Sequence, residues 1–167
     1  MSVDLSPTPT ALPTPTPSPT PRYTPLEQGD LQTWCGEFRE LYYGGDLVRA
    51  DVNEWLASQG AELTQADIDA SQDFARKFTD LYERTAALPR PTQARAINDL
   101  LSEAFHSELN AYHELNTSYT TGDPTGYDEY VELKREAERL TTEIIDLFND
   151  LLLEYDIAPV DCSLLSD

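Results

Sequence analysis

The chain has little glycine, little cysteine and little positive charge, and each shortage excludes a class of protein. Its 167 residues include only 7 glycines and 2 cysteines, which excludes collagen-like chains and small disulfide-dense scaffolds. Only 11 Lys and Arg oppose 31 Asp and Glu, so the formal net charge is -20. Nucleic acid and anionic lipid surfaces attract basic patches, so neither is an expected partner. No apolar run approaches a membrane span in length, and no membrane insertion is expected.

Motifs for catalysis and for cofactors are also missing from the sequence. It contains no Gly-x-Ser-x-Gly nucleophile turn, no glycine-rich phosphate loop and no Cys-x-x-Cys-His haem attachment sequence. Neither cysteine has a histidine nearby in the sequence to activate it as a nucleophile. We therefore predict a protein that is not an enzyme and that carries no cofactor.

The first 25 residues differ in composition from the rest of the chain. They hold 8 of the 12 prolines, most of them in Ser-Pro and Thr-Pro pairs. Each proline fixes its own φ and keeps the preceding residue extended, so such a segment buries no core. We predict a disordered Pro/Thr/Ser-rich linker over residues 1–25, followed by an acidic helical domain over residues 26–167. A plain disordered tail is the alternative interpretation.

The linker resembles the stalks that hold domains away from bacterial or archaeal envelopes. The start of the chain has no basic region, no apolar region and no cleavage motif of a signal peptide. We therefore expect an extracytoplasmic, prokaryotic cell-surface or secreted protein whose signal or anchor is not in this chain.

Apolar residues beyond residue 25 recur at steps of three and four, the spacing of amphipathic helices. The short loops between the segments favour antiparallel neighbours, so the sequence predicts an all-α, up-down-up-down four-helix bundle. The predicted helices span residues 29–59, 65–88, 92–119 and 125–155.

Two adjacent glycines, Gly44 and Gly45, interrupt the first predicted helix. Because the apolar stripe passes through them in phase, we predict one continuous helix in which Gly45 admits a bulky neighbour. A three-helix bundle with a first segment broken at these glycines is the alternative. At the other boundaries, Thr64 with Asp67 predicts a capping box, and Asp123 is the expected N-cap before Pro124.

Cys35 and Cys162 are far apart in the sequence but close in the predicted topology. In an up-down-up-down bundle, the start of the first helix and the end of the fourth lie at the same end. We therefore predict a Cys35–Cys162 disulfide, which suits an oxidising compartment outside the cytoplasm. Two buried free thiols are the alternative.

A metal site is the weakest of the hypotheses that the sequence permits. Glu103 and His106 form one Glu-x-x-His, but a carboxylate-bridged di-metal bundle needs a second on another helix. The remaining histidine, His113, lies on the same predicted helix. Two exposed or boundary histidines are the favoured interpretation, and a metal-binding bundle using Glu103, His106 and His113 is the alternative.

Aromatic residues gather near the end of the bundle that points away from the linker. Trp55, Tyr119, Tyr127 and Tyr130 combine apolar area with a hydrogen-bonding tip, which suits recognition. We expect at least two of these rings to be exposed or to line a cleft; otherwise they plug the end of the bundle.

The favoured function is a stalk-tethered, monomeric binding module for an unknown protein, glycan or small ligand. A ligand-sensing or solute-binding ectodomain is the alternative, and it needs a cavity between helices.

Overall fold

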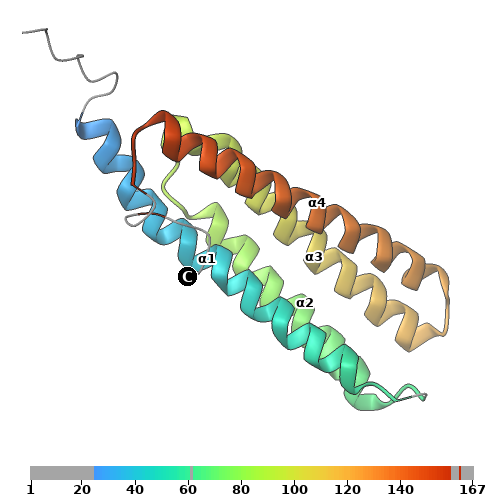
Figure 1. The fold of residues 1–167 in the computed structure, drawn as a ribbon. Coiled ribbons are helices and arrows are strands. Elements are labelled where there is room, and N and C mark those ends of the chain that lie inside the picture. Colours follow the sequence, from blue (N-terminus) through green and yellow to red (C-terminus); the bar gives the residue numbers. More distant parts are fainter. Residues whose placement is uncertain (1–24, 61, 159–161, 163–167) are drawn as a thin grey trace, which may run out of the picture.

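The computed structural model describes residues 25–60, 62–158 and Cys162. Four helices follow one another and run antiparallel to their neighbours in the chain, as Figure 1 shows. The part of the chain that is described contains no strand. The predicted all-α four-helix bundle is therefore confirmed. The helices are α1 (Pro25–Ser58), α2 (Gln65–Ala86), α3 (Arg95–Thr121) and α4 (Thr125–Glu154), with a 3-10 turn, η1 (Thr92–Ala94), before α3.

Side-chain hydrogen bonds between α1 and α3 show the direction in which the helices run. Near one end, Trp34 Nε1 donates to Asn98 Oδ1 at 2.8 Å. At the other end, Gln59 Nε2 donates to the Tyr119 hydroxyl at 3.2 Å. The first and third helices are thus parallel, as an up-down-up-down order requires.

The first helix is continuous through its two glycines, as predicted. A Cβ atom on Gly45 would lie only 2.6 Å from Cε1 of Phe105, so the glycine lets the Phe105 ring of α3 approach the backbone of α1. The helix begins at Pro25, four residues earlier than predicted, because proline is tolerated in a first helical turn. The remainder of the predicted linker, residues 1–24, lies outside the described residues.

The other helix boundaries agree with the prediction to within about three residues. Thr64 and Asp67 form the predicted capping box, with the Thr64 side chain accepting from the Asp67 N–H. The predicted cap of α4 is displaced by one residue, because Pro124 occupies the N-cap position and the helix begins at Thr125. Asp123 still supports this helix start, since its carboxylate accepts from the Thr125 backbone N–H at 3.0 Å.

Aromatic side chains dominate the core of the bundle. Full burial of each such ring contributes on the order of 1.5–3 kcal/mol to the free energy of folding. The largest fully buried aromatic residues are Trp34, Phe38, Phe78, Phe105, Tyr112 and Phe148.

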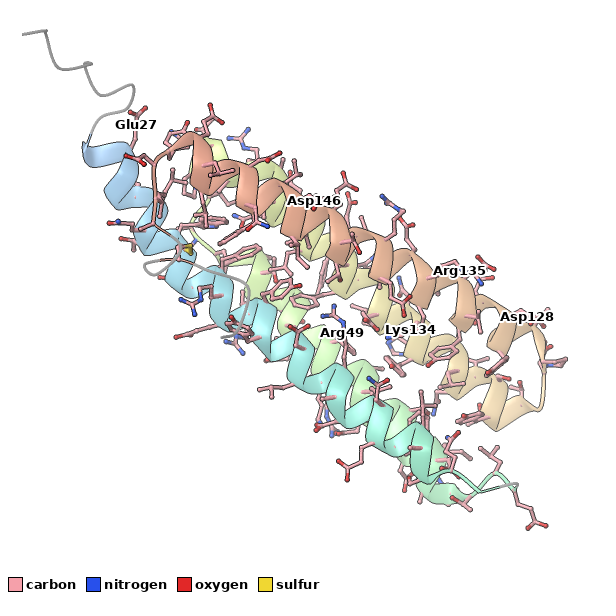
Figure 2. The ribbon with its side chains drawn as sticks, viewed as in Figure 1. Glu27, Arg49, Asp128, Lys134, Arg135 and Asp146 are labelled. Atoms are coloured by element: carbon pink, nitrogen blue, oxygen red, sulfur yellow. A yellow bond between two sulfur atoms is a disulfide. The ribbon has the colours of Figure 1, made fainter. Side chains whose placement is uncertain are left out.

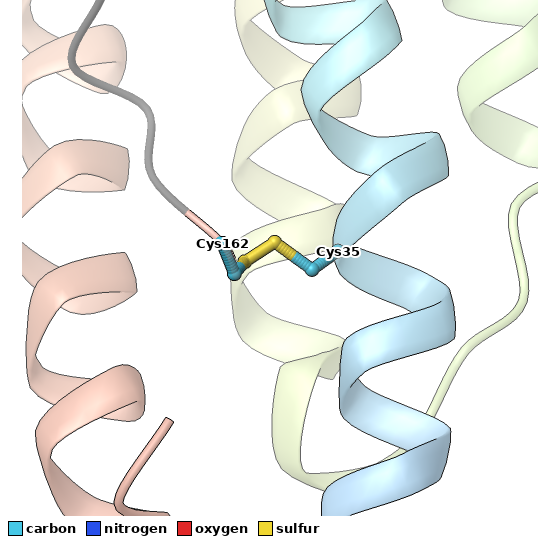
Figure 3. The surroundings of a disulfide bond; sticks show 2 residues. All are labelled: Cys35 and Cys162. Atoms are coloured by element: carbon cyan, nitrogen blue, oxygen red, sulfur yellow. A yellow bond between two sulfur atoms is a disulfide. The ribbon is translucent and has the colours of Figure 1, made fainter. Parts of the chain in front are cut away.

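The predicted disulfide joins Cys35 of α1 to Cys162 in the tail after α4 (Figure 3). The two Cα atoms are 6.0 Å apart across a sequence separation of 127 residues, and both side chains are buried. The bridge fastens the end of the chain to the first helix.

None of the described helices has an apolar stretch long enough to cross a membrane.

Candidate functional site

The side-chain contacts between α1 and α4 differ between the two halves of these helices. Near the disulfide, the Phe148 ring of α4 packs against two neighbouring rings of α1. Its centroid is 5.5 Å from that of Phe38 and 5.8 Å from that of Trp34. All three side chains are fully buried. In this half, α1 and α4 are therefore joined by buried aromatic rings.

Farther from the disulfide, a cleft of about 420 Å³ lies between α1 and α4. Its volume is within the range of small-molecule sites, which are typically about 300–1,000 Å³. Two walls, one from α1 and one from α4, enclose the cleft, and Glu108 of α3 also lines it. The α1 wall consists of Arg49, Val52, Asn53 and Leu56, and the α4 wall consists of Tyr130, Val131, Lys134, Arg135 and Glu138. We call this feature the α1–α4 cleft.

One charged residue, Glu108, occupies a core position of α3 beside the cleft. Glu108 stands seven residues from both Leu101 and Leu115, which are buried on the inner face of α3. Lys134 stands fourteen residues before Phe148, so the two share a seam of α4. Long charged side chains here replace the aromatic packing that closes the opposite half.

A buried carboxylate joins the two walls of the α1–α4 cleft. Glu108 is 1% exposed, and its Oε1 accepts from Arg49 Nε at 3.0 Å. Its Oε2 accepts from Lys134 Nζ at 2.5 Å. Figure 2 shows Arg49 and Lys134 projecting into the space between α1 and α4. The Glu108 carboxylate of α3 therefore pairs with one cation from α1 and one from α4. We call Glu108, Arg49 and Lys134 the Glu108 triad.

Arg49 also contacts residues outside the triad. Its Nη1 donates to Asp46 at 2.9 Å, and its Nη2 donates to the Thr141 hydroxyl of α4 at 3.4 Å. Burial opposes the charged form of this guanidinium, but the neighbouring Glu108 and Asp46 carboxylates outweigh burial and raise the Arg49 pKa. Arg49 is thus a permanent cation that spans three helices.

Cations gather in the α1–α4 cleft, although the chain is strongly acidic. Three cationic side chains and two carboxylates line the cleft, whereas the whole chain carries a formal charge of -20. At the rim, Arg135 is exposed and pairs with Glu132 at 2.6 Å, and Arg49 pairs with the exposed Asp46. The excess of positive charge is therefore confined to the inner part of the cleft, where Arg49 and Lys134 share the buried Glu108.

Tyr130 is the aromatic member of the α4 wall. It is 7% exposed, and its ring centroid is 5.7 Å from that of Tyr112, which lies beneath it. Burial raises the pKa of the Tyr130 hydroxyl to about 12, so the group is neutral at physiological pH. Lys134 Nζ lies 5.4 Å from the Tyr112 ring centroid, within the range of a cation–π contact.

The four aromatic residues predicted to bind a ligand occupy different environments. Tyr130 lines the α1–α4 cleft, and the neighbouring Tyr127 is 51% exposed, with its ring centroid 5.9 Å from that of Tyr130. Trp55 is half-buried against Phe74, and Tyr119 is half-buried with its hydroxyl bonded to Gln59. Their role in binding stays a prediction.

The structure gives the metal-binding alternative no support. Glu103, His106 and His113 are all exposed on α3. His106 lies against the Tyr82 ring, with the ring centroids 5.3 Å apart. Within the described ranges, no group of three or more His, Cys, Asp or Glu side chains is placed to hold a metal ion.

No motif in the sequence marks Arg49, Glu108 or Lys134 as site residues. Each belongs to a different helix, and each resembles a member of a solvated charged face when its helix is considered alone. The signal that could have identified them is a charged residue on the inner seam, as Glu108 is between Leu101 and Leu115.

Comparison with known proteins shows no protein-family model, no curated protein and no solved structure that matches this chain.

Proposed function

We propose that this protein is a non-enzymatic binding module, displayed outside the cytoplasm on its Pro/Thr-rich linker, and that it binds its ligand in the α1–α4 cleft. The observation that carries the proposal is the cleft with the Glu108 triad inside it. Buried charged groups next to a small-molecule-sized cavity are a common arrangement of binding sites.

The display outside the cytoplasm is supported by two features of the chain. The Cys35–Cys162 disulfide suits an oxidising compartment. The Ser-Pro and Thr-Pro pairs before α1 are typical of exposed stalks. The linker enters the bundle at the start of α1, so the α1–α4 cleft lies toward the half of the domain remote from the tether.

A solute-sensing ectodomain is the second candidate, and one observation favours it. The cleft lies between α1 and α4, which are the first and last helices of the described residues. A ligand held between these helices could therefore alter the separation of their remote halves, while the disulfide keeps the other end closed. Spin labels at the exposed positions Ala50 and Glu136 would report such a change as an altered label-to-label distance.

Fragment mapping by nuclear magnetic resonance tests the proposed function. The probe is a library of small aromatic fragments with equal numbers of anionic, cationic and neutral members, added to ¹⁵N-labelled protein. We expect the binding fragments to shift backbone signals of residues 49–56 and 130–138, which carry the two walls. Binding fragments that shift only signals elsewhere, or a library with no binder, would refute the proposal.

A further inference from the structure

We infer that the α1–α4 cleft selects a small organic carboxylate with an apolar body. The inference rests on the proposed function, and it adds the chemical class of the ligand. It follows from the hydrogen-bond donors, the charge and the apolar walls of the cleft.

The Glu108 triad has more donors than its own carboxylate uses. Lys134 has three N–H groups, and its hydrogen bond within the described part of the chain takes one of them, to Glu108. Arg49 has five N–H groups, of which Glu108, Asp46 and Thr141 accept three. Both side chains line the cleft and are about one-fifth exposed, at 21% for Arg49 and 19% for Lys134, so neither is sealed from a ligand in the cleft.

The carboxylate of the triad, in contrast, is almost completely buried. Both oxygens of Glu108 are bonded, and the residue is 1% exposed. An ammonium group entering the cleft would meet the two cations before it met this carboxylate. A ligand oxyanion would meet two cations with spare donors, which form strong charge-assisted hydrogen bonds.

Carboxylates at the rim of the cleft weaken the preference for an anionic ligand but do not reverse it. Asp46 is 47% exposed and already bonded to Arg49, and Glu138 is exposed on the α4 wall. Charges in contact with water are screened, whereas those near the buried Glu108 act in a lower dielectric. The inner part of the cleft therefore favours the anion.

The walls of the cleft provide apolar contact for the rest of the ligand. Val52 and Leu56 of α1 face Val131 of α4 across the cleft, and Tyr130 adds an aromatic ring. Leu56 is 41% exposed, so part of its side chain is available for contact with a ligand. A carboxylate on a short chain ending in an aromatic ring would satisfy the donors and cover these side chains.

Three probes that share one skeleton test the inference. They are 3-phenylpropanoate, 3-phenylpropan-1-ol and 3-phenylpropylamine, each titrated into ¹⁵N-labelled protein while the shifts of cleft residues are followed. We expect the carboxylate to bind at least about tenfold more tightly than the alcohol or the amine, the factor typical of one hydrogen bond to a charged group.

The chain offers a matched control for the lysine, since Lys77 and Lys134 are its only two lysines. Each lies 5.4 Å from an aromatic ring centroid and pairs with a carboxylate, but Lys77 is outside the cleft. Lys134→Met should weaken carboxylate binding at least about tenfold and leave alcohol binding within about twofold, whereas Lys77→Met should change neither.

A second pair of variants keeps the test valid if Lys134→Met does not fold. Asn53→Asp adds one negative charge to the exposed α1 wall without a change of size, and Asn149→Asp does the same at an exposed position outside the cleft. We expect Asn53→Asp, and not Asn149→Asp, to weaken the carboxylate about threefold or more at low ionic strength.

The possible outcomes separate the inference from the proposed function. If the amine or the alcohol shifts the cleft residues as strongly as the carboxylate, the inference is overturned and the binding module stands. The same holds if Asn53→Asp leaves carboxylate affinity unchanged. If neither these probes nor the fragment library shift the cleft residues, both proposals are wrong.

Discussion

The two halves of the α1–α4 interface use opposite chemistry to join the same pair of helices. In the half near the disulfide, the buried Phe148 ring stacks on Phe38 and packs at a tilt against Trp34. In the other half, Glu108 holds Arg49 and Lys134 beside a cleft of about 420 Å³. If the proposed function is correct, stability and recognition depend on different lengths of the same helices.

Energetic arguments support this division. Apolar burial contributes about 25 cal/mol for each Å² removed from water, and the disulfide adds a constraint on the unfolded chain. A buried ion cluster is a weak source of net stability, because desolvation offsets much of the attraction. The Glu108 triad is thus better explained by the orientation of charges in the cleft than by a gain in stability.

The largest expected effect is the loss of a ring from the packed half. Phe148→Ala should lower the free energy of unfolding by about 3–5 kcal/mol, because it leaves a cavity against Trp34 and Phe38. The matched change in the cleft half, Val131→Ala, should cost about 1 kcal/mol or less, since Val131 is only half-buried. Urea unfolding measures both; equal losses would remove the distinction between the halves.

Removal of the disulfide should have the next largest effect. Replacing Cys35 and Cys162 together by alanine should lower the free energy of unfolding by about 2–4 kcal/mol, because the bridge closes a loop of more than a hundred residues. Thermal unfolding with and without reductant gives the same comparison in the unaltered protein. A melting temperature that reductant leaves unchanged would show that the bridge is absent or without effect.

Removal of the buried charge should have a smaller effect than either change in the packed half. Glu108→Gln leaves Arg49 and Lys134 without their shared counter-ion, and we expect a loss of about 1–3 kcal/mol. Glu103→Gln on the same helix is the control, since Glu103 is exposed and its change should stay within about 0.5 kcal/mol. A loss at Glu108 larger than at Phe148 would make the triad the main stabilising element and contradict the division proposed above.

The smallest expected effect is a decline in stability at alkaline pH. Burial raises the pKa of Tyr130 from 10.0 to about 12, so the folded state keeps the proton to higher pH than the unfolded state. The resulting stability is fully present below pH 10 and is lost as pH rises toward about 12. Burial also raises the pKa of Tyr112 and of Tyr42, so Tyr130→Phe should make this decline less steep, without removing it, in urea unfolding measured across that range. An equally steep decline in Tyr130→Phe would assign it to other groups.

Periodicity predicted the fold because helices and turns are determined locally. The apolar stripe crossed Gly44 and Gly45 in phase, and α1 is continuous there. The disulfide could be predicted because antiparallel topology brings Cys35 and Cys162 to the same end. The start of α1 at Pro25 could not be predicted, because the apolar stripe begins at Leu31 and does not mark the turns that precede it.

The α1–α4 cleft could not be predicted from single-helix patterns. Its position depends on three charged residues that meet only after the helices pack, and on their registers relative to one another. The aromatic residues gave a partial indication, since Tyr130 lines the cleft, whereas Trp55 and Tyr119 are held by neighbours elsewhere. A charged residue in place of a core leucine, as at Glu108, is the pattern that would have located the site.

Hydrogen exchange with and without 3-phenylpropanoate tests the division of the α1–α4 interface most directly. Mass spectrometry of the intact disulfide-linked protein would follow backbone amides in residues 31–42, from the packed half, and in residues 49–58 and 126–138, from the cleft half. We expect slower exchange in the packed half of the free protein, and ligand protection confined to the cleft half. Equal exchange in both halves, or ligand protection in residues 31–42, would contradict the account.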